Sequence, residues 1–190
     1  MKFLIAGLGN IGEEYHNTRH NVGFRILDSL AEKKEVSFSL DRHSFYANYK
    51  FKGRQIHMIK PTTYMNLSGK AIRFWLQKLD VSTENLLVLV DDMALPFGKL
   101  RLRAKGGDAG HNGLKDIIAI LGNSKFPRLR FGIGDEFHKG QQVDFVLGKW
   151  SAEEENQLPP LIDRCHQVIH SFATIGIGRT MTDFNRKQEQ

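Results

Sequence analysis

Residues 2–23 read KFLIAGLGNIGEEYHNTRHNVG, an apolar run that leads into a polar loop containing several glycines. The run predicts a buried strand, and apolar residues recur at helical spacing across residues 21–34. Gly7, Gly9 and Gly12 spell G-x-G-x-x-G, the fingerprint of dinucleotide-binding enzymes. That fingerprint requires a helix that begins within the motif and faces the pyrophosphate, whereas here the helix begins about one loop later. The stretch therefore predicts a strand, a polar loop and a helix, and it disfavours a nicotinamide enzyme.

The rest of the chain alternates between predicted strands and predicted helices. Strands are predicted at residues 45–51, 55–59, 86–90, 99–103 and 128–133, and helices at residues 68–79, 113–121 and 151–174. Ser68 is the expected cap of the second helix. The sequence predicts a single α/β domain over residues 1–190, with a twisted, mixed, mostly parallel sheet between two helical layers.

Three segments are harder to assign from the pattern alone. Residues 142–147 fit either a short strand or an irregular segment. Pro159 and Pro160 are expected to break or restart the last helix, because proline lacks the N–H that a helix interior needs. The polar tail after Gly178 is expected to fray.

The composition is that of a globular protein with an excess of basic residues. Lysine and arginine number 27 against 21 acidic residues, which gives a net charge of +6 and favours a polyanionic partner such as nucleic acid. The single cysteine, Cys165, excludes a disulfide framework within the chain and favours a reducing compartment. Apolar runs are too short for a membrane span, and the start of the chain lacks the pattern of a signal peptide. We expect a cytoplasmic protein that does not associate with membranes.

Basic residues alternate along one predicted strand. Lys99, Arg101, Arg103 and Lys105 have a period of two, and Arg128 and Arg130 repeat the pattern. Side chains at this spacing share one face of a strand. The face could be an ordinary solvated surface or a track for nucleic-acid phosphates.

Polar loops follow the predicted central strands, where ligands bind in parallel α/β sheets. These loops contain Asn10, His20 with Asn21, Tyr64 to Asn66, Asp91 with Asp92, and His111 with Asn112. Side-chain amides supply both hydrogen-bond donors and an acceptor without charge, so they suit contacts with a peptide backbone. We interpret the glycines of the first loop as allowing the tight turn that presents Asn10.

A histidine and an aspartate in these loops could activate a water molecule. His20 could act as the base, and Asp91 could fix its tautomer. The chain has no G-x-S-x-G motif, and Cys165 is more simply a buried small hydrophobe, so an acyl-enzyme is disfavoured. His20 could equally be a surface or capping residue, and the aspartates could cap a turn. A metal held by His20, Asp91, Asp92 and His111 is disfavoured, because the sequence lacks the usual ligand spacing.

The ordered blocks GLGN, TRHNVG, PTTYMNLSG, LVDDMALPFG, KGGDAGHNGLKDI and RLRFGIG closely resemble bacterial-type peptidyl-tRNA hydrolases, from residue 1 to beyond residue 150. The resemblance implies one α/β domain that hydrolyses the ester between a peptide and the 3′ end of tRNA. It implies a monomer that needs neither metal nor other cofactor. It places the catalytic base on His20, its supporting carboxylate on Asp91, and on Asn10 the amide that distinguishes N-blocked from free aminoacyl groups.

The resemblance also implies contacts with the peptide and the tRNA acceptor end. These contacts fall on Tyr15, Tyr64, Met65, Asn66, His111, Asn112 and Gly113, with backbone N–H groups near Gly113 helping to polarise the ester carbonyl. The chain departs from the family pattern at Ile11, Ala94 and Tyr64, where proline, aspartate and phenylalanine are usual. None of the three alters the proposed histidine–aspartate pair.

The basic residues complete the expected site. Arg101, Arg103, Lys105 and Arg130 are the candidate contacts to tRNA phosphates, which carry no sequence information. A non-enzymatic RNA-binding module could use the same basic face. The histidine, aspartate and asparagine set argues against that rival, because a binding module needs no poised base.

Overall fold

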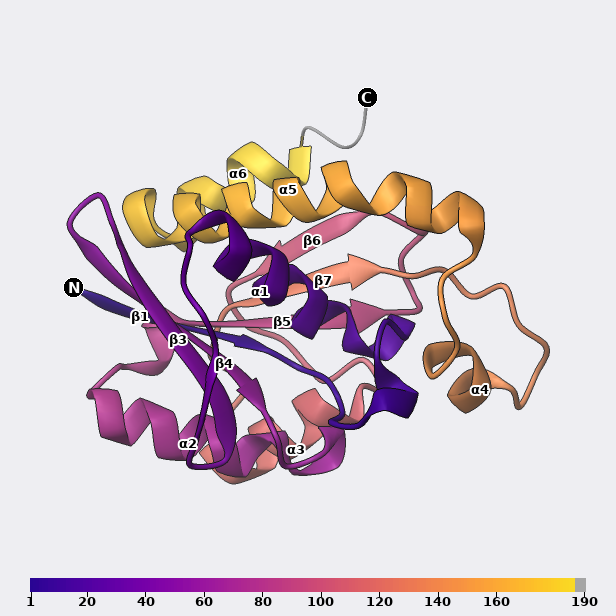
Figure 1. Cartoon of the computed structure of the whole chain (residues 1–190), viewed down its shortest axis with the longest axis horizontal. Helices are drawn as coiled ribbons and strands as arrows, with labels where there is room; N and C mark the ends of the chain where they lie inside the picture. Colours follow the sequence, from indigo (N-terminus) through magenta and orange to yellow (C-terminus); the bar gives the residue numbers. More distant parts are fainter. Residues whose placement is uncertain (187–190) are drawn as a thin grey trace.

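A seven-stranded mixed sheet forms the centre of the computed structural model, which describes residues 1–186 (Figure 1). The strand order is β2-β3-β4-β1-β5-β7-β6. The strands are β1 (Lys2–Gly7), β2 (Ser39–Asp41), β3 (Ser44–Phe51), β4 (Arg54–Pro61), β5 (Leu86–Asp92), β6 (Leu100–Arg103) and β7 (Arg128–Gly132). Strands β4, β1, β5 and β7 are parallel, and antiparallel strands flank them on both sides. The predicted α/β fold is confirmed.

The central strands are buried on both faces, which explains their continuous apolar sequences. Every residue of β5 is buried, and Ile5 of β1 lies in register with Leu87 of β5. Ile5 and Leu87 belong to one hydrophobic cluster, whereas their neighbours Leu4 and Val88 belong to a second cluster on the opposite face. The alternation of strand side chains therefore supplies two cores, one on each side of the sheet.

Helices cover both faces of the sheet, with α5 and α6 on one side and α2 and α3 on the other (Figure 1). The helices are α1 (Val22–Lys33), α2 (Ser68–Leu79), α3 (Asn112–Leu121), α4 (Gln142–Val146), α5 (Ala152–Ile175) and α6 (Ile177–Arg186). Helix α1 packs on the face that α5 covers, because their buried residues share one cluster. Short 3-10 turns, η1 (Glu13–Tyr15), η2 (Arg19–Asn21), η3 (Met65–Leu67) and η4 (Thr83–Asn85), connect these elements. In the part of the chain described here, no helix has both the length and the apolarity of a membrane span.

Several local predictions at the C-terminal end are wrong. Residues 142–146 form the helix α4, which lies beyond the carboxyl ends of β5 and β7 (Figure 1). Helix α5 continues through Pro159 and Pro160, both of which are exposed, so the predicted break does not occur. The tail also does not fray after Gly178 up to Arg186, since it forms α6; residues 187–190 lie outside the described residues.

The predicted cap at Ser68 is wrong as well. Helix α2 begins at Ser68, so the capping position falls on Leu67, which makes no side-chain cap. The Ser68 hydroxyl instead donates to the carbonyl of Met65 at 2.7 Å and joins the helix to the 3-10 turn before it. This contact ties α2 to a loop that carries candidate site residues.

Close packing between β1 and α1 explains two glycines of the loop region. A Cβ atom on Gly7 would lie 2.3 Å from the carbonyl oxygen of Gly23, and one on Gly23 would lie 2.6 Å from the backbone nitrogen of Leu8. Gly12, by contrast, adopts a φ of 115°, which an L-residue rarely tolerates. The expected turning role therefore falls on Gly12, while Gly7 and Gly23 let the start of α1 contact the end of β1.

Candidate active site

A histidine and an aspartate meet at the carboxyl edge of the sheet. His20 lies in η2, just before α1, and Asp91 lies at the end of β5. The Nδ1 atom of His20 is 2.9 Å and 3.0 Å from the two carboxylate oxygens of Asp91. Because a carboxylate only accepts, Nδ1 carries the proton and Nε2 keeps a free lone pair. The imidazole is therefore set up to accept a proton at Nε2.

A second imidazole contacts the same carboxylate. His111 precedes α3, and its Nε2 is 2.9 Å from Oδ1 of Asp91. Its Nδ1 accepts the backbone N–H groups of Gly113 and Leu114 at 3.1 Å and 3.3 Å. A nitrogen that accepts cannot carry a proton, so His111 is neutral and donates from Nε2 to Asp91. His111 thus caps α3 and anchors Asp91 at once.

The environment fixes the charge state of this group. Burial by itself raises the pKa of Asp91, yet the two imidazoles that face it hold the pKa well below its ordinary range. Burial also lowers the pKa of His20, but the charge of Asp91 and its hydrogen bond more than offset this. The pKa of His20 therefore lies above its ordinary value of 6.5. The result is a charged carboxylate beside a histidine that is strengthened as a base.

A pair of asparagines connects this group to the first loop. The side-chain oxygen of Asn21 accepts the backbone N–H of Asn10 at 2.8 Å, and its amide donates to the Asn10 carbonyl at 2.9 Å. The side-chain oxygen of Asn10 accepts the N–H of Met65 at 2.7 Å. The amide nitrogen of Asn10 is therefore the part of this side chain that can donate to a ligand.

A cavity of about 130 Å³ adjoins the imidazole–carboxylate group. Its walls include His20, Asp91 and His111 from the loops, Asn112 from the start of α3, and Val143 from α4. The volume is several times that of one water molecule in the liquid, about 30 Å³, so a water and a small reacting group fit beside the imidazole.

The remaining predicted contact residues differ in exposure, and Met65, only 4% exposed, is packed in the hydrophobic core. Tyr64 is 50% exposed, Asn66 and Asn112 are exposed, and Tyr15 is half-buried, so these side chains are available to a ligand. Gly113 is different, because its N–H is already bonded to His111. The N–H of Gly113 itself is therefore not available to polarise a substrate carbonyl.

The structure divides the predicted basic track in two. Arg101 and Arg103 lie opposite Arg130 and Arg128 in the β6–β7 pair, and Arg103 and Lys105 are exposed. Arg130 is only 9% exposed, because it donates to the carbonyl of Gly107 at 2.9 Å and lies 3.7 Å from Asp92. We therefore remove Arg130 from the exposed phosphate contacts and retain Arg101, Arg103 and Lys105.

Arg128 is fully buried and holds the loop that leads to His111. Its guanidinium donates to the carbonyl oxygens of Gly106, Gly107, Ser124 and Phe126 at 2.7–3.3 Å. Burial and the neighbouring charge of Arg130 lower the pKa of Arg128 to about 10, so it remains charged at neutral pH. The expectation that it continues an exposed basic face is wrong.

The same geometry bears on two alternative chemistries, a bound metal ion and a cysteine nucleophile. Within residues 1–186, His20, Asp91 and His111 form the one group whose ligating atoms could share a metal ion, all within 4.8 Å. A metal would have to displace both imidazole protons that now bind Asp91. Asp92 does not join the group: its Oδ1 accepts the N–H of Ala94 at 2.8 Å. Cys165 is buried, and burial raises the pKa of its thiol, so it is not an activated nucleophile.

Comparison with known proteins gives the family. The family model described as "Peptidyl-tRNA hydrolase" matches residues 4–190. The chain belongs to the peptidyl-tRNA hydrolase family. The peptidyl-tRNA hydrolase of Cytophaga hutchinsonii is 53% identical over 99% of this chain and 100% of its own length, and that of Porphyromonas gingivalis is 55% identical over 97% and 100%. The solved peptidyl-tRNA hydrolase of Acinetobacter baumannii has a TM-score of 0.90 at 32% identity, over 97% of this chain and 94% of that one.

Membership of the peptidyl-tRNA hydrolase family makes the chain an enzyme of the hydrolase class. Sequence reasoning missed two structural roles at its site. Asn21 was grouped with His20 by its position in the loop, but nothing in the pattern indicated that it holds Asn10. His111 was placed near the substrate, whereas its side chain bonds Asp91 and the start of α3. Both roles depend on loops that meet only in the folded chain.

Proposed function

We propose that the protein hydrolyses the ester between a peptide and the 3′ end of tRNA, with a water molecule activated by His20. The observation that carries the proposal is the hydrogen bond from Nδ1 of His20 to buried Asp91, which leaves Nε2 free beside a cavity. Membership of the peptidyl-tRNA hydrolase family supports this substrate. Release of the tRNA would return it to translation.

The chemical step needs one base that later acts as an acid. Nε2 of His20 takes a proton from water as the water oxygen attacks the ester carbonyl, and Asp91 stabilises the imidazolium that forms. When the tetrahedral intermediate collapses, the bond to the ribose 3′ oxygen breaks, and the same imidazolium returns its proton to that oxygen. The products are a free peptide carboxyl group and a tRNA with a 3′ hydroxyl.

The asparagines account for the choice of substrate. The side-chain oxygen of Asn10 already accepts the N–H of Met65, so its amide nitrogen is the group that would donate to a substrate. A peptide linkage supplies a carbonyl oxygen to that donor, whereas a free aminoacyl group presents only a charged amine, which donates. The unmet donor therefore disfavours free aminoacyl-tRNA. Exposed Asn66 and Asn112 are placed to hold further peptide groups or the ester oxygen.

The tRNA would bind through its phosphates. Arg101, Arg103 and Lys105 form the accessible part of the basic track on β6 and the segment that follows it. Contacts of this kind recognise charge and backbone shape, not base sequence. They fit an enzyme that has to accept every tRNA.

One experiment tests the proposal. Purified protein is assayed on N-acetyl-aminoacyl-tRNA and on free aminoacyl-tRNA, with EDTA present in both assays. We expect cleavage of the first substrate alone, and a loss of roughly 10²–10⁴-fold in turnover for His20→Ala. Tight RNA binding without cleavage would favour the RNA-binding module, and loss of activity with EDTA would favour a metal at His20, Asp91 and His111.

A further inference from the structure

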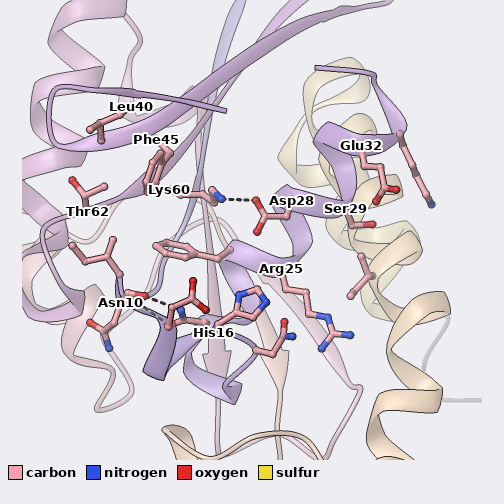
Figure 2. Close-up of a pocket in the computed structure, with 18 of the residues that line it drawn as sticks. Asn10, His16, Arg25, Asp28, Ser29, Glu32, Leu40, Phe45, Lys60 and Thr62 are labelled. Carbon is pink, nitrogen blue, oxygen red and sulfur yellow. Dashed lines mark hydrogen bonds and ion pairs between the residues drawn. The ribbon is translucent and has the colours of Figure 1, made fainter. Parts of the chain in front are cut away.

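A large groove is lined by Asn10 but not by His20 or Asp91. Its volume is about 1260 Å³, and its floor is the outward face of α1, from Phe24 to Lys33. Leu40 and Phe45 form one wall, from the β2–β3 region, and residues of α5 form the other. Figure 2 shows Asn10 and His16 at one end of this α1 groove and Glu32 at the other. No step of the proposed hydrolysis uses it.

We propose that the α1 groove holds the peptide of peptidyl-tRNA upstream of the residue that is esterified to tRNA. The inference rests on the proposed function and adds a binding site for a longer peptide. If the ester carbonyl lies beside His20 and the first peptide carbonyl lies on Asn10, the chain continues past Asn10. Asn10 lines the α1 groove, so this is the surface that the next residues meet.

The dimensions fit several peptide residues. Helix α1 has 12 residues and is therefore about 18 Å long. An extended peptide rises about 3.3 Å per residue, so about five residues can lie along the helix. A single N-acetylated amino acid would end at Asn10, at one end of the groove, and would not extend along α1.

The charges of the groove favour peptide over RNA. Its three Lys and Arg side chains are all paired: Lys60 with Asp28, Lys33 with Asp163, and Arg25 with Glu155 at 2.7 Å. Figure 2 shows the pair between Lys60 and Asp28 across the groove. Glu13 and Glu32 add further carboxylates to the lining. Among the lining residues that the structure describes, a phosphate backbone would meet no unpaired Lys or Arg, whereas the basic track lies on β6, at the far edge of the sheet from β2.

Apolar and aromatic surface gives the groove a way to bind peptides without reading their sequence. Lys60 lies 4.5–5.6 Å from the ring centres of Phe24, Phe38 and Phe45, so its charge is held against three rings. Leu40, at the rim, is 70% exposed and adds apolar surface to the lining of the groove. Such a surface contacts a peptide through its backbone and Cβ atoms.

Blocking the groove tests the inference. Ser29→Cys places a thiol on the groove face of α1, and the native Cys165 is fully buried, so a bulky maleimide reacts at position 29 alone. The matched control is Ser82→Cys, an exposed position before η4 at the amino end of β5, which is labelled in the same way. Both proteins are assayed on N-acetyl-phenylalanyl-tRNA and on a hexapeptidyl-tRNA that ends in phenylalanine.

We expect the label at position 29 to lower kcat/KM at least tenfold on the hexapeptidyl substrate and to leave the N-acetyl substrate unchanged. Leu40→Asp should act in the same direction without a label. An equal loss on both substrates, or no loss on either, would overturn the inference while leaving the hydrolase itself intact. Failure of unmodified protein to cleave either substrate would overturn the proposed function, and the groove assignment with it.

Discussion

Asn21 joins the loop that contains His20, the proposed base, to the loop that contains Asn10, and its replacement by alanine should break that link. Asn21 is 5% exposed and forms hydrogen bonds of 2.8 Å and 2.9 Å to the backbone of Asn10. It occupies the N-cap position of α1, but its side chain makes no capping hydrogen bond. Asn21→Ala therefore removes the two bonds to Asn10 without removing a helix cap.

The expected cost follows from these contacts. A buried hydrogen bond contributes about 0.5–1.5 kcal/mol to stability, so the two bonds give about 1–3 kcal/mol. The backbone N–H and carbonyl of Asn10 also lose their partners, which adds a desolvation cost, but Asn10 is partly exposed and water satisfies these groups in part. We therefore expect Asn21→Ala to lower the free energy of unfolding by about 2–3 kcal/mol. Urea unfolding at constant m-value measures this change. The ratio of kcat/KM for N-acetyl-aminoacyl-tRNA to that for free aminoacyl-tRNA should fall in the same variant.

Asn21→Asp provides the matched control. It keeps the shape and still accepts the N–H of Asn10, but it places a carboxylate oxygen against the Asn10 carbonyl. This variant should be at least as unstable as Asn21→Ala near neutral pH. Acidification protonates the new carboxyl group and restores a donor, so the difference from wild type should shrink as pH falls. An Asn21→Ala protein within 0.5 kcal/mol of wild type, with unchanged selectivity, would refute the reasoning.

Three further predictions address the charges of the site. The pH profile of kcat/KM should rise with a midpoint above 6.5, because His20 must lose its proton to act as base. In Asp91→Asn the midpoint should move to lower pH, because the burial that lowers the pKa of His20 is no longer offset by the charge of Asp91. The plateau of kcat/KM should also fall roughly 10²-fold or more. An unmoved midpoint would argue against the pairing of His20 with Asp91. Arg128→Met should cost about 2–4 kcal/mol in urea unfolding, since the carbonyls it binds lose their donor, whereas Arg103→Met should stay within about 0.5 kcal/mol; equal effects would contradict this assignment. Charge reversal of both Arg101 and Arg103 to Glu should weaken cleavage and reduce the slope of log kcat/KM against log salt by roughly 1–2, and an unchanged slope would remove them from the tRNA contacts.

The sheet and the helices on it could be predicted because their apolar residues recur with the period of the element. Strand β5 is continuous and apolar because both of its faces are covered, and α1 follows its glycine loop at helical spacing. The polar composition of the C-terminal tail hid a helical pattern, because Ile177, Met181 and Phe184 recur at i, i+4 and i+7 and pack against the hydrophobic cluster that contains the buried residues of α5. Asn185 of α6 donates to the carbonyl of Leu102 and accepts its N–H, both at 3.0 Å. It thereby occupies backbone groups of the edge strand β6, and a polar tail gives no hint of such a partner.

Helix α4 is a second element that the sequence pattern did not predict. Its five residues are too few for a period to be read, and the segment is held from outside. Arg19 donates to the carbonyl of Phe145 at 3.2 Å and lies 4.3 Å from the centre of the Phe145 ring. Because Arg19 adjoins His20, the contact joins α4 to the loop that contains the proposed base. Only the folded chain brings the two segments together.

The candidate site was predictable in part. Parallel strands bring the loops after β1, β4 and β5 to one edge, so a sequence can indicate that Asn10, Met65 and Asp91 approach one another. The sequence does not indicate whether each of these side chains is exposed or covered by another segment. The alternation of arginines predicted a shared face on β6 and β7, but the loop that folds back over Arg128 and Arg130 hides that face on β7. A period of two reports which side chains share a face and does not report what covers the face.

The two imidazoles on Asp91 explain how one carboxylate can serve both the fold and a catalytic base. A buried carboxylate needs donors to stay charged, and a carboxylate served by His20 alone would lose its donor whenever that ring reoriented. His111 cannot reorient without losing the N–H groups of Gly113 and Leu114, so its Nε2–H continues to donate a hydrogen bond to Asp91. His111 adds no charge of its own in this state. The charge of Asp91 therefore remains available to His20, and it stabilises the imidazolium that the proposed reaction forms and removes in each turnover.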